Sequence, residues 1–303
     1  MSIKKISWLK GYDDAESFAS TRIRLFYPHN TINEFHRDKY VSVIGFDKNA
    51  DILIVQKLIK NENIELIKNF KGMVIYDFDD TIGYSEMKKI LPYIDLVTTN
   101  TECRKKQFDG LFNDIDCEVV RDCIDYGVIS SNEPPNILNK ICWFGNWPNY
   151  SSIQRMTPDI VASDFELSII TDIKSFKFYL HPSIKKIQWN LETFIEDLRS
   201  SNICLLSHYG PDAMFKSDNK LIISIASGLP CIVNSSESYE SLVREFGLDY
   251  CIVDNGHSLI DVMNYLNNIE NRKKYLKDIQ PYIINNFSSK SITKRLVEVI
   301  EKQ

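Results

Sequence analysis

Lys220 and Asn219 have the clearest capacity for chemistry, because both fall in the first turn of a predicted helix. The helix is expected over Ser217–Ser227, and Ser217 or Asp218 can cap its N-terminus. Unpaired backbone N–H groups, the helix dipole and a lysine ammonium together favour an anionic ligand, phosphate above all. The same residues also suit a surface helix with a solvated lysine.

Two further residues extend this candidate phosphate site. Lys216 directly precedes the helix, and His208 follows a predicted strand beside the same loop, where it could hold a phosphate or a leaving group. A loop histidine with an ordinary hydrogen bond fits the position of His208 equally well. The other four histidines show no spacing typical of metal ligands, so we expect no bound metal.

A second cationic candidate lies near the start of the chain, at Arg22 and Arg24. Paired arginines could bind an anionic substrate or a diphosphate group, and a helix face with two solvated arginines is the alternative. Lys57 follows Gln56 at the end of a predicted buried strand. Polar residues at the carboxyl end of a parallel strand face the ligand crevice, so Lys57 joins the candidate contacts.

Carboxylates follow a buried strand at Asp77, Asp79 and Asp80, and others lie on an early loop at Asp13 and Asp14. The Asp-x-Asp pattern at Asp77 and Asp79 resembles the first motif of haloacid-dehalogenase-type phosphatases. That resemblance implies a nucleophile at Asp77 and an acid/base at Asp79. The motif usually opens its domain, however, and here at least three strand–helix units precede it.

The elements that must position these residues alternate between short apolar runs and longer amphipathic segments. The predicted strands are Ile3–Leu9, Tyr40–Gly45, Asp51–Gln56, Met73–Asp77, Asp95–Thr99, Cys117–Val120, Ile141–Gly145, Leu167–Thr171, Lys177–Leu180, Asn202–Ser207, Pro230–Asn234 and Asp249–Val253. The predicted helices are Asn63–Phe70, Ser85–Leu91, Thr101–Phe108, Glu192–Ser200, Ser217–Ser227, Ser238–Phe246, Ser258–Asn267, Arg272–Ile279 and Ser288–Lys302. Such repetition implies parallel sheets with helices on both faces.

The segment Ser130–Lys140, which contains Pro134 and Pro135, interrupts this alternation and predicts a linker. We therefore expect an α/β chain of two Rossmann-like, doubly wound domains, residues 1–133 and 141–287, facing a central cleft that holds the ligand. A helix over residues 288–303 could pack back on the N-terminal domain.

Composition narrows the class of protein. The chain has 303 residues and a net charge of −5, which fits two soluble domains and argues against a dedicated nucleic-acid binder. The seven cysteines form no CxxC pair, and this indicates a reducing compartment. Neither a signal peptide nor an apolar run long enough to span a membrane is evident. We therefore expect a cytoplasmic protein.

The segment KSDNKLIISIASGLPCIV, residues 216–233, resembles the donor domain of nucleotide-sugar glycosyltransferases of the GT-B fold. The resemblance extends to ICWFGN at 141–146, to YESLVREFGLDYCIVD at 239–254, and to Trp189 before a helix. Many retaining members carry two glutamates eight positions apart in this segment. Phe215 and Ile223 occupy those positions here, so the stereochemical outcome stays open.

The resemblance implies a metal-independent glycosyltransferase that uses a nucleotide-sugar as co-substrate and needs no cofactor. Its donor contacts would be Gly145, Asn146, Trp189, His208, Lys216, Ser217, Asn219 and Lys220. The N-terminal domain would bind a glycan or lipid-linked acceptor, with Arg22, Arg24 and Lys57 as contacts and Asp79, Asp80 or Asp14 as the base. Bacterial surface-polysaccharide synthesis is the expected setting, with peripheral membrane association left open. A phosphatase and a non-catalytic nucleotide-binding protein are the alternatives.

Overall fold

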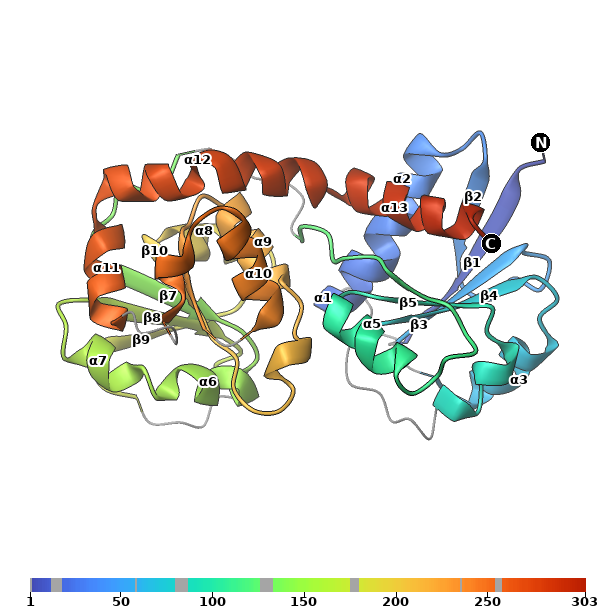
Figure 1. Ribbon diagram of the computed structural model, residues 1–303, viewed down its shortest axis with the longest axis horizontal. Coiled ribbons are helices and arrows are strands. Elements are labelled where there is room, and N and C mark those ends of the chain that lie inside the picture. Colours follow the sequence, from blue (N-terminus) through green and yellow to red (C-terminus); the bar gives the residue numbers. More distant parts are fainter. Residues whose placement is uncertain are drawn as a thin grey trace. The chain divides into compact units, whose positions relative to one another are not determined.

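The computed structural model describes residues 2–11, 18–57, 59–79, 87–125, 133–174, 180–234, 236–253 and 258–303 (Figure 1). The chain forms two compact units. The first comprises Met1–Asp125 together with Asn286–Gln303, and the second comprises Tyr126–Asn285. The division between them falls at Asp125, ahead of the Pro134–Pro135 segment that the sequence indicated as a linker.

The first unit is built on a six-stranded parallel sheet with the order β2-β1-β3-β4-β5-β6. Its strands are β1 (Lys4–Leu9), β2 (Tyr40–Ile44), β3 (Ile52–Gln56), β4 (Met73–Phe78), β5 (Leu96–Thr99) and β6 (Cys117–Val119). The direction of winding reverses between β1 and β3, which are neighbours in the sheet. In doubly wound sheets the carboxyl ends of the strands at such a reversal form the ligand crevice.

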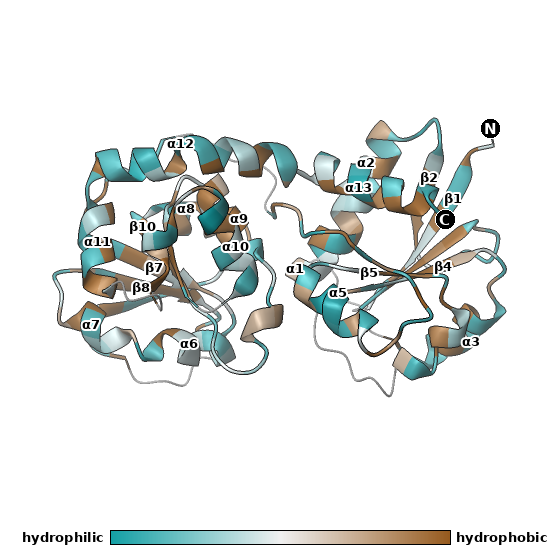
Figure 2. Ribbon diagram, viewed as in Figure 1, coloured by the Kyte–Doolittle hydropathy of each residue, from teal (hydrophilic) through white to brown (hydrophobic). Residues whose placement is uncertain are grey.

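Alternation along β3 shows why this sheet is buried on both faces. Ile52 and Ile54 pack into a core with the helices that follow β1 and end the chain, whereas Leu53 and Val55 pack into a second core on the opposite face. Successive side chains of a strand point to opposite faces, so a continuous apolar run fills both cores. Figure 2 shows β4 and β5 largely brown and the outer faces of the surrounding helices largely teal.

Helices cover both faces of the first sheet: α1 (Ala19–Thr21), a π-helical turn at Arg22–Phe26, α2 (Tyr27–Phe35), α3 (Asn61–Asn69), a 3₁₀ turn at Leu91–Tyr93, α5 (Glu102–Asp109) and α13 (Ser289–Glu301). The last of these packs beside α2, where the hydroxyls of Thr31 and Ser289 lie 2.6 Å apart. Ile292, Leu296 and Ile300 of α13 enter the same core as Ile54. The end of the chain therefore completes the first unit.

The second unit contains a five-stranded parallel sheet with the order β11-β10-β7-β8-β9. The strands are β7 (Lys140–Phe144), β8 (Glu166–Thr171), β9 (Ile184–Gln188), β10 (Ile203–Leu206) and β11 (Cys231–Val233). The helical elements are a 3₁₀ turn at Trp147–Tyr150, α6 (Ser151–Gln154), α7 (Thr157–Val161), α8 (Phe194–Arg199), a 3₁₀ turn at Ala213–Phe215, α9 (Asn219–Ala226), α10 (Glu237–Glu245), a 3₁₀ turn at Asp249–Cys251, α11 (Leu259–Asn267) and α12 (Ile269–Asn286). Winding reverses between β7 and β10.

One predicted strand of the second unit was wrong, and another lies mostly in a part of the chain that the structure does not describe. The strand expected at Asp249–Val253 is a 3₁₀ turn, and only Ile252 bridges to Val233. The strand expected at Lys177–Leu180 falls largely outside the described residues, and β9 follows it at Ile184–Gln188. Because β9 is an edge strand with mostly exposed side chains, it lacks the apolar run that marked the others.

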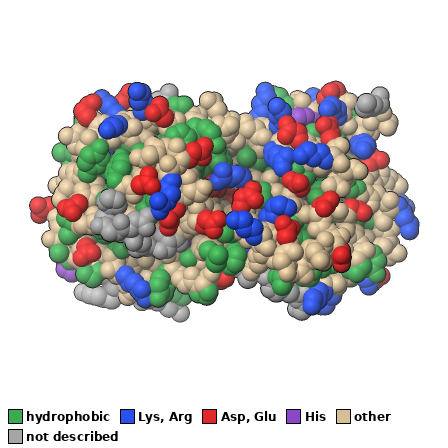
Figure 3. All heavy atoms as spheres, viewed as in Figure 1, with side chains coloured by type: hydrophobic (Ala, Val, Ile, Leu, Met, Phe, Trp, Pro, Cys, Tyr) green, Lys and Arg blue, Asp and Glu red, His purple; other side chains and the backbone are tan. Residues whose placement is uncertain are grey.

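The remaining expectations from composition concern cysteine and the membrane. All seven cysteines are buried. Within the described ranges, no helix has the length and apolar character needed to cross a membrane. Figure 3 shows acidic and basic side chains interspersed on the visible face, consistent with a net charge of only −5.

Candidate functional site

The carboxyl ends of β7 and β10 bring the predicted phosphate-binding residues of the second unit together. Gly145 directly follows β7, and His208 follows β10 by two residues. The chain then runs through a loop into α9, whose first two residues are Asn219 and Lys220. These strands are neighbours at the point where the winding reverses, which is the position favoured for ligands in such sheets.

The Lys220 side chain is half-buried and lies over aromatic rings. Its Nζ is 5.1 Å from the ring centre of Trp143 and 5.6 Å from that of Phe144. No carboxylate within the described part of the chain forms an ion pair with it. Burial, with a smaller contribution from the charge of Lys216, lowers the pKa of Lys220 to about 8. A partly desolvated cation without an anionic partner is a strong attraction for an anionic ligand.

Gly145 fits closely against this lysine. Its φ is +155°, and a Cβ placed there would lie 2.5 Å from Lys220 Nζ and 3.2 Å from the Trp143 ring. The carbonyl of Gly145 accepts a hydrogen bond of 2.7 Å from Thr171 Oγ1 at the end of β8. The bare backbone of this loop therefore leaves room for the ammonium group and is held in place from the neighbouring strand.

His208 lies beside the lysines as a neutral group. Its Nε2 is 2.9 Å from the hydroxyl of Tyr239, a fully buried residue of α10. Burial, assisted by the charges of Lys220 and Lys216, lowers the pKa of His208 to about 3. At neutral pH this histidine can therefore serve a ligand as a hydrogen-bond donor or acceptor, but adds no positive charge.

Of the other residues predicted for this site, some lie near Lys220 in the chain and one lies further along the sheet. Ser217 lies in the loop before α9, Asp218 occupies the N-cap position, and the exposed Asn146 begins the turn after Gly145. Trp189 follows β9, which is separated from β7 by β8, so it lies about 10 Å further along the sheet. Its backbone N–H donates to the Thr171 carbonyl at 2.9 Å, but it does not join the lysine cluster.

For Arg22 and Arg24 the sequence suggested either a pair that binds an anion or a helix face with solvated arginines. The structure shows a third arrangement. Arg24 is buried, and its guanidinium donates at 2.8 and 2.5 Å to the two oxygens of Asp77, at 3.0 Å to Asp122, and at 2.7 Å to the Val120 carbonyl. Arg22 is equally buried and pairs with Asp125 at 2.7 Å. Neither arginine is solvated, and both are paired with carboxylates of the protein.

This pairing also bears on the proposed phosphatase nucleophile. Asp77 receives Arg24 at both carboxylate oxygens, and Thr98 Oγ1 donates a further bond of 2.6 Å. Burial by itself lowers the pKa of Arg24. The charge and hydrogen bonds of Asp77 raise this pKa by more, so the net shift is upward. A nucleophile must present a free oxygen to the reacting atom, and Asp77 is instead occupied by structural contacts.

Lys57 and Asp79 form a separate pair at the ends of β3 and β4, with Lys57 Nζ 3.3 Å from Asp79 Oδ1. Lys57 has a φ of +60°, which is unusual for a residue other than glycine. Two bonds of 2.8 Å hold it there, from its N–H to the Asp77 carbonyl and from the Tyr76 hydroxyl to its own carbonyl. Burial raises the pKa of Asp79, although Lys57 and Arg24 oppose the rise.

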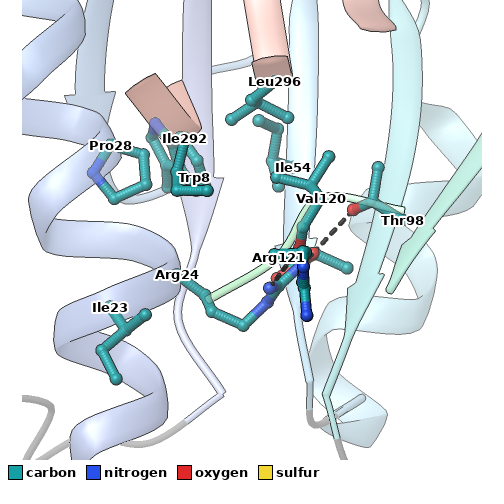
Figure 4. Close-up of a pocket in the computed structure, with 11 residues that line it drawn as sticks. Trp8, Ile23, Arg24, Pro28, Ile54, Thr98, Val120, Arg121, Ile292 and Leu296 are labelled. Carbon is teal, nitrogen blue, oxygen red and sulfur yellow. Dashed lines mark hydrogen bonds and ion pairs between the residues drawn. The ribbon is translucent and has the colours of Figure 1, made fainter. Parts of the chain in front are cut away.

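Two buried polar atoms at this edge lack a hydrogen-bond partner among the described residues. They are Gln56 Nε2 and Asn100 Oδ1, at the ends of β3 and β5, whereas Asp79 Oδ1 at the end of β4 has its ion pair with Lys57. A small pocket lined in part by Arg24 and Thr98 lies on the same sheet (Figure 4). It has a volume of about 10 Å³, room for a single water molecule, and apolar side chains form most of its lining.

Some predicted residues cannot be placed, and others were missed. Asp80, Asp14 and Asp13 lie outside the described residues. Sequence patterns did not single out Tyr239 or Thr171 as site residues, because the partner of each is 31 or 26 positions away in the chain. The described residues contain no group of three or more His, Cys, Asp or Glu side chains arranged to hold a metal.

Two parallel-sheet α/β units, each wound in both directions, define the GT-B architecture, and the fold class expected from the sequence is confirmed. No protein-family model and no curated protein matches this chain. Among solved structures, it is similar to the apo form of the lipopolysaccharide outer core galactosyltransferase WaaB. The TM-score is 0.59 at 15% identity, with 98% of this chain and 99% of that chain covered.

Two other solved structures resemble it to a similar degree. An alpha1,3-fucosyltransferase aligns with a TM-score of 0.57 at 11% identity, covering 98% of this chain and 90% of that one. The N-terminal domain of a trehalose-6-phosphate phosphatase from Candida albicans gives a TM-score of 0.57 at 7% identity, with 99% and 97% covered. At these identities the likeness concerns the fold alone.

Proposed function

We propose that this protein is a glycosyltransferase that moves a sugar from a nucleotide-sugar donor to a hydroxyl group of an acceptor. The observation that carries the proposal is Lys220, a half-buried ammonium without a carboxylate partner among the described residues, at the reversal point of a GT-B-type sheet. Breaking the bond between sugar and diphosphate builds negative charge on the leaving phosphate. A preorganised cation placed there stabilises that charge.

In this proposal the second unit binds the donor. Lys220, Lys216 and the first-turn N–H groups of α9 would receive the phosphates, and neutral His208 would add a hydrogen bond. Gly145 and Asn146 would allow the phosphates to approach the backbone closely. Trp189, further along the sheet, would reach only a more distant part of the donor.

The first unit would supply the base that receives the acceptor proton. Asp79 is the candidate among the described residues, since burial raises its pKa and so strengthens it as a proton acceptor near neutral pH. Lys57 would hold its carboxylate in place. Asp80 and Asp14 stay as alternatives for this role.

The finer assignments are part of the same proposal. We expect a hexosyl or related transfer to a glycan or lipid-linked acceptor, without a metal or other cofactor, in bacterial surface-polysaccharide synthesis. The similarity to a structure named as a lipopolysaccharide galactosyltransferase supports this setting. A cytoplasmic protein with peripheral membrane association would fit such acceptors, and nucleic acid is not an expected partner.

A thermal-shift screen against UDP, GDP, CMP and their sugar conjugates tests the donor site. A ligand present at 100 times its dissociation constant stabilises the folded state by about 2.7 kcal/mol, so at least one nucleotide should raise the Tm clearly. Lys220→Met keeps an unbranched side chain of similar length but removes the charge. It should weaken nucleotide binding by roughly 10- to 100-fold, the range for one charged hydrogen bond.

The matched control is Lys273→Met, which removes an exposed lysine of α12 that pairs with Glu270. It should leave nucleotide affinity unchanged. If no nucleotide binds, or if the two methionine variants behave alike, the donor assignment is wrong. A nucleotide that binds while no conjugate is hydrolysed or transferred would favour the non-catalytic alternative.

A further inference from the structure

We propose that the open edge of β6 binds an extended peptide segment of another protein, with acidic side chains turned toward α13 and basic side chains turned toward α5. β6 is the last strand of the six-stranded sheet and pairs with β5 alone among the described strands. An exposed sheet edge can accept a further strand from a partner, whose main chain then continues the hydrogen-bonded ladder. Such a docking surface does not depend on the glycosyl transfer proposed above.

Alternation along β6 determines which backbone groups face this edge. In a parallel pair, alternate residues of a strand bond to the neighbouring strand. Bonds of 2.9 and 2.8 Å join the Asp116 carbonyl and the Val120 N–H to β5. The even-numbered residues of this segment therefore bond inward, and Cys117 and Val119 present their backbone N–H and C=O groups to the open side.

Cys117 and Val119 differ in what these outward groups meet. The Cys117 carbonyl accepts a hydrogen bond from the Lys105 ammonium group of α5. The outward N–H and C=O of Val119 have no hydrogen-bond partner within the described part of the chain. A cavity of about 350 Å³ lies beside them, and Val119 is part of its lining. That volume falls in the range of ligand-binding clefts, so a chain segment can reach the open backbone groups.

Helices on opposite faces of the sheet form the two walls of this cavity. Phe108 of α5 packs into one core of the first unit, and Ile292 of α13 packs into the other. The described lining residues all belong to the first unit. The charged ones are Glu102, Lys105, Glu118, Arg121 and Arg295.

The wall beside α13 has a net positive charge. Arg295 of α13 pairs with Glu118 of β6 at 2.7 Å, so one charge balances the other. Arg121 adds a second cation, and its guanidinium lies 4.8 Å from the ring centre of Phe287, shortly before α13 begins. Two cations and one carboxylate give this side a net charge of +1, which favours an acidic side chain.

The wall beside α5 has the opposite sign. Lys105 pairs with Asp109 at 3.3 Å, and Glu102 lines the cavity as a second carboxylate. One cation and two carboxylates give this side a net charge of −1, which favours a basic side chain. Successive side chains of a strand point to opposite faces, so a segment in which acidic and basic residues alternate matches both walls at once.

A proton–nitrogen NMR titration of the full chain tests the proposal with two peptides of identical composition. In acetyl-TEKEKT-amide the glutamates share one face of the strand and the lysines share the other, whereas acetyl-TEEKKT-amide mixes them on both faces. The alternating peptide should move the Val119 amide signal. It should bind at least about threefold tighter than the mixed peptide at about 0.01 M salt, the scale of surface ion pairs. The difference should vanish near about 1 M salt, because screening removes it.

Two proline variants test the backbone contact. Val119→Pro removes the outward N–H but leaves the ladder to β5 intact, because edge strands tolerate proline at such positions. It should weaken the alternating peptide at least about threefold, the effect of one hydrogen bond. Ile44→Pro is the matched control on the opposite edge of the sheet. The Gly45 N–H donates to the Trp8 carbonyl, so by the same alternation the Ile44 N–H faces outward on β2. This control should leave peptide affinity unchanged.

Glu102→Gln leaves the backbone untouched and makes the α5 side neutral. It should reduce the preference for the alternating peptide, while affinity for the mixed peptide stays within about twofold. Failure of the alternating peptide to bind, equal affinity of the two peptides at low salt, or equal losses in the two proline variants would overturn the proposal. So would a shift of the Val119 amide that grows with protein concentration alone, since a second copy of the chain would then occupy the edge.

Discussion

The carboxyl edges of the two sheets both carry buried cationic side chains, but they use them differently. In the first unit Arg24 is enclosed by Asp77, Asp122 and a backbone carbonyl. In the second unit Lys220 lies over aromatic rings, with no carboxylate paired to it among the described residues. The first arrangement satisfies its charge within the fold, and the second leaves it to be satisfied by a ligand.

This difference separates cations that stabilise the fold from cations that bind. Buried charge is tolerated when it is paired and is costly when it is not. Arg24 and Lys220 both stand at sites where ligands are expected in doubly wound sheets, so position alone does not distinguish them. The carboxylates that pair with Arg24 distinguish it from Lys220. Each of the following experiments tests that distinction.

Arg24→Met should have the largest effect. It leaves Asp77 and Asp122 buried and uncompensated, which costs about 3–5 kcal/mol in the free energy of unfolding. Arg244→Met is the matched control, because Arg244 also pairs with two carboxylates, Glu240 and Asp249, but at an exposed site. It should cost about 0–1 kcal/mol by denaturant unfolding. Equal losses of unfolding free energy in the two variants would show that Arg24 does not stabilise the fold more than an exposed arginine does.

Nucleotide affinity should depend on pH through Lys220. Its pKa of about 8 means that the ammonium is largely present at pH 7 and largely lost at pH 9, so affinity should fall by about tenfold across that interval. Isothermal titration of the best nucleotide from the thermal screen measures the change. The Lys220→Met variant should show a flat profile, and a decline as steep as the wild type would point to another group.

The same titration has a consequence for stability in the absence of ligand. Lys220 releases its proton at a lower pH in the folded chain than at its ordinary pKa of 10.5 in the unfolded chain, so its charge destabilises the fold below about pH 8. Lys220→Met should therefore match or exceed the wild-type Tm at pH 7, with any excess shrinking as the pH rises toward 10.5.

Gly145→Ala should have the smallest effect. The added Cβ would approach Lys220 Nζ to 2.5 Å, and the end of a lysine can move aside, so we expect nucleotide affinity to fall by about three- to tenfold. Gly247→Ala is the control, since it also has a positive φ, +67°, but no atom within 4 Å of the new Cβ. It should show a similar backbone cost of about 1 kcal/mol without loss of affinity.

The positions of most strands and the two ends of α9 could be predicted from the sequence, because they depend on local patterns. Buried parallel strands are continuous apolar runs, and β3 and β4 were located to within a residue at each end. Gly228, with a φ of +82°, ends α9 as a glycine after a helix should. The position of Lys220 in the first turn of α9 could be predicted from the same pattern. The aromatic rings next to its ammonium group could not.

The fate of the arginines could not be predicted, because their partners are distant in the chain. Asp77 is 53 positions from Arg24, and Asp125 is 103 positions from Arg22. A sequence pattern within one segment shows a charged side chain but not what neutralises it. For the same reason, the unpartnered atoms of Gln56 and Asn100 become visible only when the ends of three strands are brought together.

The place of α13 has a consequence for the order of folding during synthesis. The second unit is continuous in sequence, whereas the first needs Asn286–Gln303, which is synthesised after the whole of the second unit. Until then, the core that receives Ile292, Leu296 and Ile300 lacks one wall. The ribosome can thus release a folded second unit before the first is closed, and fragments that stop near Asp125 will expose that apolar surface.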